Sequence, residues 1–397
     1  MSFATLPAEL LLQVAAYIDS DSDLNSAIRT CGWLYITLDG YLYNRQDKAS
    51  ATAALFWASE HGISSTARRF INIGANFNAT KDEGGLTPLM LNAQKGHENL
   101  VALLLSLPGI NLNAYHELYR KTALHFAAMG GHYGVVELLV QAKGVDLNHC
   151  EGDYGATPLI ELISATPSGP RKNDAMKLLV EQYGVDLNTP DNKWDLSPLL
   201  WAIQGWEPDI ACILLERESV RVDFEDPQGR TAIWWAAKRG YEKCVRMLLE
   251  RDDIDVNAIE RKCQTPLWVA AKKGHVAVVR MLIAAGADPT ARDDDSYRNA
   301  LTVAAANDQD EVVSLLISQT GIDYTLEDVE CLRAFSLRAQ QRGNLESARS
   351  ISNKLGRQVG SEDGRRRRER PRERAHSTRG TGLISRFRKV LLEPGGG

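Results

Sequence analysis

The chain has 397 residues, of which 44% are hydrophobic and 24% charged, and these proportions are those of a folded protein rather than of a disordered one. No stretch approaches the roughly 18 consecutive apolar residues that cross a bilayer, and the N-terminus has no basic segment ahead of an apolar run. The six cysteines are scattered without a C-x-x-C pair, which argues against a zinc site or a disulfide framework. We therefore expect an intracellular protein of the nucleus or the cytoplasm, with no membrane-spanning segment.

The formal net charge of −5 is unevenly distributed along the chain. Residues 357–397 contain 12 Lys and Arg against 5 Asp and Glu, a local excess of +7, which leaves −12 for the preceding 356 residues. An acidic folded part does not suit the phosphate backbone of a nucleic acid. We therefore expect no direct nucleic-acid binding by the folded part of the chain.

Residues 1–48 form the first predicted unit, a small helical module. Pro7 suits the first position of a helix, and a second helix is expected after the acidic stretch at 19–23. Each helix carries apolar residues on one face at helical spacing. These residues are Leu10, Leu11, Val14, Tyr17 and Ile18 in the first helix, and Leu24, Ala27, Ile28, Cys31 and Leu34 in the second.

With its L-P-x-E-L-L opening and its terminal L-Y, this segment resembles the F-box, in the form that precedes repeat arrays in filamentous fungi. The resemblance implies docking to the linker subunit of a cullin-RING ubiquitin ligase. The positions that match the family's contact motif are Leu6, Pro7, Leu10 and Leu11. The alternative interpretation is a helical cap that only covers the exposed core of the first repeat.

Residues 49–325 contain one phrase eight times, as in KTALHFAAMGGHYGVVELLV and QTPLWVAAKKGHVAVVRMLI. Weaker copies begin at Ala53 and Asn299. The six clear copies between them start at a Thr or a Ser, with spacings of 35, 35, 40, 34 and 34 residues. These starting residues are Thr87, Thr122, Thr157, Ser197, Thr231 and Thr265. A period between about 20 and 50 residues predicts a solenoid of stacked repeats.

The phrase resembles the ankyrin repeat, whose T-P-L-H-x-A-A-x-x-G-H core and V-V-x-L-L-L continuation recur at about 33 residues. The Thr or Ser caps the first helix of a pair, and a proline such as Pro88 suits its first turn. Gly96 and Gly131 suit the left-handed end of that helix, while Val135 and Leu139 represent the apolar face of the second. The resemblance implies an all-α solenoid of helix pairs joined by short hairpin fingers, acting as a non-enzymatic scaffold that binds proteins.

Three segments depart from the repeat pattern. The fourth repeat has SATPSGPRKN in place of Gly-His, which predicts a protruding loop, and the eighth repeat has Asp308 where glycine is expected. Residues 326–356 carry two amphipathic helical patterns around Gly343. We expect them to form a degenerate repeat that caps the array.

No sequence motif of a known catalytic class occurs in the chain, so we expect no catalytic, cofactor or metal site. His97, His132 and His275 occupy the same position after glycine in their repeats, and they are expected to form hydrogen bonds between turns. Trp234 and Trp268 replace the histidine of the family's T-x-x-H pattern. We expect these two side chains to pack between repeats.

Ankyrin partners usually contact the hairpin tips and the two residues before the helix-ending glycine, so the resemblance implies a client-protein site on the concave face. The candidate contacts are Gln94, Lys95, Lys238, Arg239, Lys272, Lys273, Asp293, Asp294, Asp295 and Tyr297. The alternative interpretation is a charged face that only contacts solvent.

Residues 357–397 are rich in Arg and Gly and are expected to be a disordered basic tail. The tail contains a compact run of the kind that importins read. Its basic residues are Arg365, Arg366, Arg367, Arg368, Arg370, Arg372 and Arg374. Two functions fit these features: a receptor that presents a bound protein to a ubiquitin ligase, and a nuclear coregulator that binds a transcription factor.

Overall fold

The computed structural model of the chain describes residues 48–318, 325–353 and 355. The predicted F-box-like module with Leu6, Pro7, Leu10 and Leu11 lies outside the described residues, as does the arginine run. Predictions that rest on these two segments therefore stay predictions.

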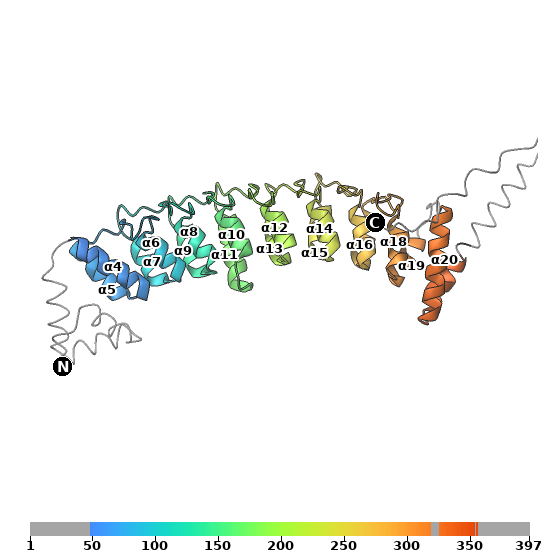
Figure 1. Cartoon of the computed structure of the whole chain (residues 1–397), viewed down its shortest axis with the longest axis horizontal. Coiled ribbons are helices and arrows are strands. Elements are labelled where there is room, and N and C mark those ends of the chain that lie inside the picture. Colours follow the sequence, from blue (N-terminus) through green and yellow to red (C-terminus); the bar gives the residue numbers. More distant parts are fainter. Residues whose placement is uncertain (1–47, 319–324, 354, 356–397) are drawn as a thin grey trace, which may run out of the picture.

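The described residues form an all-α array of helix pairs that stack side by side along one axis (Figure 1). The first helices of the pairs are α4 (Lys48–His61), α6 (Pro88–Lys95), α8 (Ala123–Met129), α10 (Pro158–Ser164), α12 (Pro198–Gln204), α14 (Ala232–Arg239), α16 (Pro266–Lys273), α18 (Ala300–Ala306) and α20 (Leu326–Gln341). The second helices are α5 (Ser64–Ile73), α7 (Glu98–Leu105), α9 (Tyr133–Gln141), α11 (Pro170–Val180), α13 (Pro208–Leu215), α15 (Glu242–Leu249), α17 (Val276–Ala284) and α19 (Asp310–Ser318).

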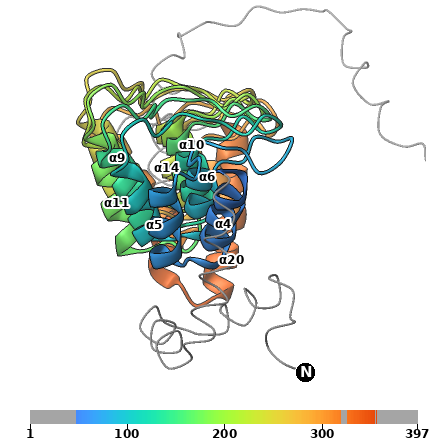
Figure 2. The same ribbon diagram turned by 90° about the vertical axis from the view of Figure 1, so that its left-hand side faces the viewer.

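Two layers of helices result, because each first helix contacts the first helices of its neighbours and each second helix contacts the neighbouring second helices. Viewed down the array, α5, α9 and α11 lie in one row and α4, α6, α10 and α14 in the other, with the fingers along one edge (Figure 2). A further helical segment at 345–353 follows α20. The prediction of an all-α ankyrin-type solenoid is confirmed.

Four first helices, α6, α10, α12 and α16, begin where the sequence predicts, at a capping hydroxyl followed by proline. Thr231 precedes α14 without forming such a bond. Thr265 Oγ1 accepts the backbone N–H of Trp268 at 3.1 Å, and Thr87 Oγ1 accepts that of Met90 at 3.3 Å. Such a cap is worth about 1 kcal/mol. Proline in the first turn lacks only an N–H that the helix would not have used.

Glycine ends the first helix in the regular repeats, because the next repeat leaves no room for a side chain. Gly96 has φ of 76°, and a Cβ built on it would lie 2.4 Å from His132 Nδ1. His132 Nε2 in turn lies 2.9 Å from the carbonyl oxygen of Gln94. Gly240 and His275 repeat this arrangement, with the built Cβ at 2.7 Å from the ring. The predicted role of these histidines in bonding between turns is thus seen at His132 and His275.

Asparagines beyond the second helices join one repeat to the next. Asn113 Nδ2 donates to the carbonyl oxygen of Gly144 at 2.8 Å, while its Oδ1 accepts the N–H of Asp146 at 2.7 Å. Asn148 and Asn188 make the same pair of bonds further along the array. One side chain therefore satisfies both a donor and an acceptor of the following repeat, which keeps the register of the stack.

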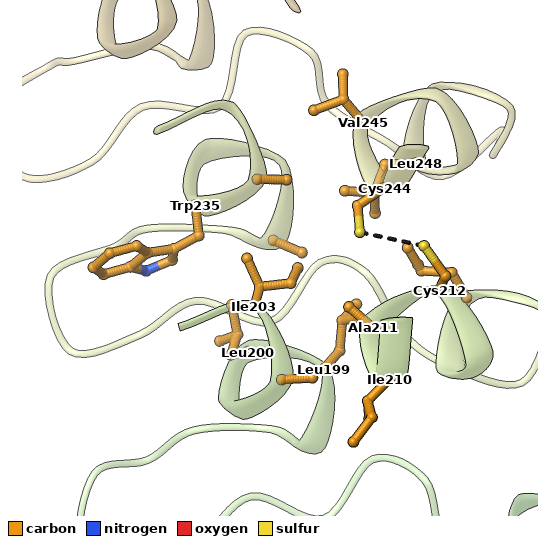
Figure 3. Close-up of a cluster of buried hydrophobic side chains, with 14 of the residues drawn as sticks. Leu199, Leu200, Ile203, Ile210, Ala211, Cys212, Trp235, Cys244, Val245 and Leu248 are labelled. Atoms are coloured by element: carbon orange, nitrogen blue, oxygen red, sulfur yellow. Dashed lines mark hydrogen bonds between the residues drawn. The ribbon is translucent and has the colours of Figure 1, made fainter. Parts of the chain in front are cut away.

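The core is continuous between the layers, as the close-up of α12, α13 and α15 shows (Figure 3). Leu199, Leu200 and Ile203 of α12 lie against α13, and the Sγ atoms of Cys212 and Cys244 approach to 3.5 Å between α13 and α15. Alanine pairs in the first helices are fully or almost fully buried and allow close approach of neighbouring backbones. These pairs are Ala127 with Ala128, Ala236 with Ala237, and Ala270 with Ala271.

The insertion in the fourth repeat predicts a protruding loop; in the loop at 165–169, residues 166–168 are exposed, but the loop does not project freely. Its Thr166 carbonyl oxygen would lie 2.4 Å from a Cβ built on Gly131, and the Tyr133 hydroxyl donates to the carbonyl oxygen of Pro167. The loop thus takes the place over Gly131 that a histidine ring takes over Gly96.

Candidate protein-binding face

A buried acidic side chain holds the turn of most fingers. Asp191 is 2% exposed, and its carboxylate accepts the N–H groups of Trp194 at 3.0 Å and Leu196 at 2.8 Å. Because this carboxylate faces inward, the residues that follow it are left at the surface as the finger tip. The acids that occupy this position are Glu151, Asp191, Asp226, Glu260 and Asp293.

Asp293 corrects the prediction of a partner contact at this position. The side chain is 2% exposed, and it accepts the N–H groups of Ser296 at 3.0 Å and Arg298 at 2.8 Å. Its role is to shape the finger. Asp294 and Asp295 are exposed, as predicted.

The other predicted contacts fall into separate groups. Gln94 and Lys95 are exposed at the end of α6, with α8, α10 and α12 between them and α14. Lys238 and Arg239 end α14, which packs on α16. Lys272 and Lys273 end α16, so the structure brings four cations together there. Exposed Tyr297 lies on a finger instead.

Aromatic side chains on neighbouring fingers form a set that the sequence interpretation missed. Tyr119 and Tyr154 are each 47% exposed and Trp194 is 51% exposed. Lys193 Nζ lies 4.0 Å from the ring centre of Tyr154 and 5.1 Å from that of Trp194. Their spacings of 35 and 40 residues equal the repeat spacings at that point of the chain, and this coincidence was the available signal. We call Tyr119, Tyr154 and Trp194 the aromatic finger tips.

Backbone hydrogen bonds join successive fingers, with one change in the middle. Gly152 N donates to the carbonyl oxygen of Tyr119 at 2.9 Å, and Asn192 N donates to that of Tyr154. Each donor directly follows the buried acid of its finger. In the next finger this position is Pro227, which has no N–H to donate. In the following finger, Arg261 N again donates, to the carbonyl oxygen of Gln228 at 3.0 Å. The series of hydrogen bonds between fingers is therefore interrupted at Pro227, next to the aromatic finger tips.

Cations and tryptophan rings alternate where α12, α14 and α16 end. Trp235 is buried and donates from Nε1 to Asp226 Oδ2 at 2.9 Å. Lys238 Nζ lies 4.5 Å from the Trp235 ring centre, and the Arg230 guanidinium carbon lies 4.4 Å from it. Lys272 Nζ lies 4.9 Å from the ring centre of Trp268. The basic side chains thus make cation–π contacts with the indole rings of Trp235 and Trp268.

Trp234 and Trp268 pack between repeats, as predicted. They are 4% and 3% exposed, and their Nε1 atoms donate to the carbonyl oxygens of Gln264 at 3.1 Å and Arg298 at 2.9 Å. His125 stands at the same position and places Nε2 3.2 Å from the carbonyl oxygen of Ala156. Each ring therefore bonds the carbonyl just ahead of the next repeat's first helix.

Trp206 is the exposed member of this aromatic group. It stands nine residues after the capping Ser197, where Gly96 and Gly240 stand in their repeats, and its φ is 66°. The indole is 68% exposed, and the Arg239 guanidinium carbon lies 3.8 Å from its centre. A bulky residue in a left-handed conformation costs about 1 to 2 kcal/mol. No burial of the indole offsets that cost.

We call the first-helix ends and finger tips whose side chains are wholly or partly exposed the recognition face. It comprises Gln94, Lys95, Tyr119, Tyr154, Trp194, Trp206, Lys238, Arg239, Lys272, Lys273, Asp294, Asp295 and Tyr297. The family model described as "Ankyrin repeats (3 copies)" matches residues 28–116, 112–191, 162–260 and 258–328. The chain belongs to the ankyrin-repeat family. Ankyrin repeats are protein–protein interaction modules.

One solved structure similar to this ankyrin array is that of the ankyrin repeat domain of Bcl-3, titled a unique member of the IkappaB protein family. It is 26% identical, covers 59% of this chain and 99% of its own, and superposes with a TM-score of 0.47. No curated protein sequence matches the chain.

Positive charge is concentrated around Lys238, at the end of α14. Burial lowers the pKa of Lys238, and the nearby charges of Arg230, Arg239 and Lys273 lower it further.

Within the described ranges, no cluster of His, Cys, Asp and Glu could hold a metal ion. None of the described helices is long and apolar enough to cross a membrane.

Proposed function

We propose that this protein holds a partner protein on its recognition face and presents it to a cullin-RING ubiquitin ligase through its N-terminal module. The exposure of Trp206, Trp194, Tyr154 and Tyr119 carries the partner-binding part of this proposal. Trp, Tyr and Arg supply most of the binding free energy in protein interfaces. Rigid helix ends and hydrogen-bonded fingers present these side chains in fixed positions, which lowers the entropy lost on binding.

The ligase part of the proposal rests on the sequence of residues 6–45. Leu6, Pro7, Leu10 and Leu11 match the contact motif of the F-box and would pack against the linker subunit. A chain with a ligase-docking segment at one end and a protein-binding array after it has the two contacts that a substrate receptor needs.

Affinity purification of the intact protein from its own cells, with quantitative mass spectrometry, tests both parts. Replacement of Leu10 and Leu11 by Asp should remove the linker subunit and the cullin while client proteins remain bound. A variant with Lys143→Glu and Lys177→Glu, two exposed lysines outside the recognition face, is the matched control. Failure of the wild-type protein to recover linker subunit and cullin would refute the ligase part.

The arginine run supports a second candidate, a nuclear coregulator that binds a transcription factor. In that case importin would bind Arg365 to Arg374, and the N-terminal module would serve only as a cap. Deletion of 365–374 should then move the protein to the cytoplasm and silence its target genes. Unchanged localisation, or clients recovered together with the cullin, would favour the ligase receptor instead.

A further inference from the structure

The cations of the sixth and seventh repeats lack the carboxylates that balance charge elsewhere in the array. Within the described part of the chain, Lys238, Arg239, Lys272 and Lys273 take part in no ion pair. The nearby carboxylate, Asp226, is 4% exposed and already accepts Arg230 Nε at 2.8 Å. Some basic side chains elsewhere in the array are neutralised across repeats, as Arg342 is by Asp308 at 2.8 Å and Asp310 at 2.7 Å. An excess of positive charge therefore stays open to solvent at this place.

Trp206 adds an apolar contact beside these cations. Its exposed indole stacks against Arg239, and α12, α14 and α16 follow one another in the first-helix layer. We call Trp206, Lys238, Arg239, Lys272 and Lys273 the cationic tryptophan surface. Packed helices lie about 8 to 10 Å apart, so this surface is about 16 to 20 Å long. An extended chain of about six residues spans that length.

We propose that the cationic tryptophan surface binds an extended acidic segment of the partner protein, whose aromatic or large apolar side chain packs on Trp206. This inference rests on the proposed partner-binding function and names the chemistry of the partner. Carboxylates of the segment would pair with the lysines. The Arg239 guanidinium, whose Nη2 donates to the carbonyl oxygen of Gln204 at 2.9 Å, would stay stacked on the indole while its Nη1 donates to a carboxylate. The strained backbone at Trp206 keeps the indole exposed in the free protein, ready for this contact.

An acidic peptide fits better than a single-stranded nucleic acid, although both combine negative charge with groups that stack on indoles. The neighbouring fingers expose Glu225, Asp294 and Asp295, and these would repel a continuous phosphate chain that runs past the surface. A peptide can place its carboxylates only where the lysines lie. The excess of negative charge in the first 356 residues points the same way.

Selection from a displayed library of random heptapeptides on the full chain tests this chemistry without a known partner. We expect enrichment of sequences with several Asp or Glu and one aromatic residue. Fluorescence anisotropy of a selected, labelled peptide then measures affinity for the variants. Lys272→Glu with Lys273→Glu, and separately Trp206→Gly, should each weaken binding at least about tenfold. The Lys143→Glu, Lys177→Glu control should bind as the wild type does.

Three results would overturn the inference. The first is enrichment of peptides without acidic residues, and the second is an affinity of both surface variants equal to that of the wild type. The third is displacement of the peptide by oligouridylate RNA at a lower concentration than by unlabelled peptide. Because Trp206→Gly restores the residue found in regular repeats, its loss of binding would not come from misfolding. Cellular partners that bind the Lys272→Glu, Lys273→Glu variant at full strength would leave the proposed function intact. They would place the partner elsewhere on the recognition face, such as the aromatic finger tips.

Discussion

The regular repeats and the fourth and fifth repeats solve the same structural problem with different chemistry. After Gly96 or Gly240, the histidine of the next repeat covers the helix end and bonds one of its carbonyl oxygens. Ten residues after its capping Ser197, the fifth repeat has Glu207 at the position of that histidine. A carboxylate cannot donate a hydrogen bond to a carbonyl oxygen, so a cation has to lie between the two.

Lys172 supplies that cation. Its side chain is fully buried, and Nζ donates to the carbonyl oxygens of Ile163 and Ala165 at 2.7 Å each and to Glu207 Oε1 at 2.8 Å. The regular repeats thus close each helix end with one histidine of the next repeat. The middle of the array depends instead on a charged network across two repeats. The comparison teaches that departures from the repeat pattern mark where the fold contains a buried charge, at Lys172, and a strained backbone, at Trp206.

Loss of Lys172 should give the largest effect. Lys172→Met removes three hydrogen bonds and leaves Glu207 with the Ser168 hydroxyl but without its cation, so we expect the free energy of unfolding to fall by about 4 kcal/mol. Urea unfolding followed by circular dichroism measures it. Lys177→Met, an exposed position on the same helix, should change stability by less than about 0.5 kcal/mol. Equal midpoints for the two variants would show that the network stabilises nothing.

Acidification should destabilise the third repeat more than the sixth and seventh, because His125 titrates whereas Trp234 and Trp268 at the same position do not. Burial lowers the pKa of His125 from 6.5 to about 4. The unfolded chain therefore binds a proton more readily between these values, and stability falls as pH falls from 6.5 to 4. The loss should reach about 3 kcal/mol at pH 4.

The check is the free energy of unfolding at several pH values for the wild type and for His125→Asn. The variant should be less stable at pH 7 but should lack this part of the slope. Parallel pH profiles for the two proteins would contradict the assignment.

Glycine at the end of a regular first helix should matter for two separable reasons. Gly96→Ala brings a left-handed alanine and pushes the His132 ring away from Gln94, which should cost about 2 kcal/mol. Gly109 has a similar φ of 81° but nothing within 4 Å of a built Cβ. Gly109→Ala should therefore show only the backbone part, about 1 kcal/mol. Thermal unfolding of both proteins would contradict this account if the losses were equal.

The regular repeats could be predicted from the sequence because their residues act within one repeat or at a fixed offset. Thr265 caps a helix that begins at the next residue, and Trp268 occupies a position whose contact with the next repeat is also made by His125 and Trp234. Burial of Lys172 could not be predicted, since its partner lies 35 residues away and the insertion shifts the register between them.

The recognition face was harder to predict than the fold. Within the run at 293–295 only the first aspartate turns inward, because the backbone of its own finger offers it N–H donors. Residue type alone does not reveal that, although alignment with the buried Asp226 and Glu260 would have done so. Alignment at the glycine position would likewise have singled out Trp206.

The smallest expected effect is that of Trp206→Gly. This change relieves a left-handed conformation worth about 1 to 2 kcal/mol, but it loses the stacking on Arg239 and gains freedom in the unfolded chain, each worth about 0.5 to 1 kcal/mol. Because the gain and the losses cancel, the free energy of unfolding should stay within about 0.5 kcal/mol of that of the wild type. Trp194→Gly, at a finger tip without positive φ, has no strain to relieve and should lose stability. If both variants lost stability equally, the Trp206 backbone would be unstrained in solution, and the exposed indole would need no partner to explain it.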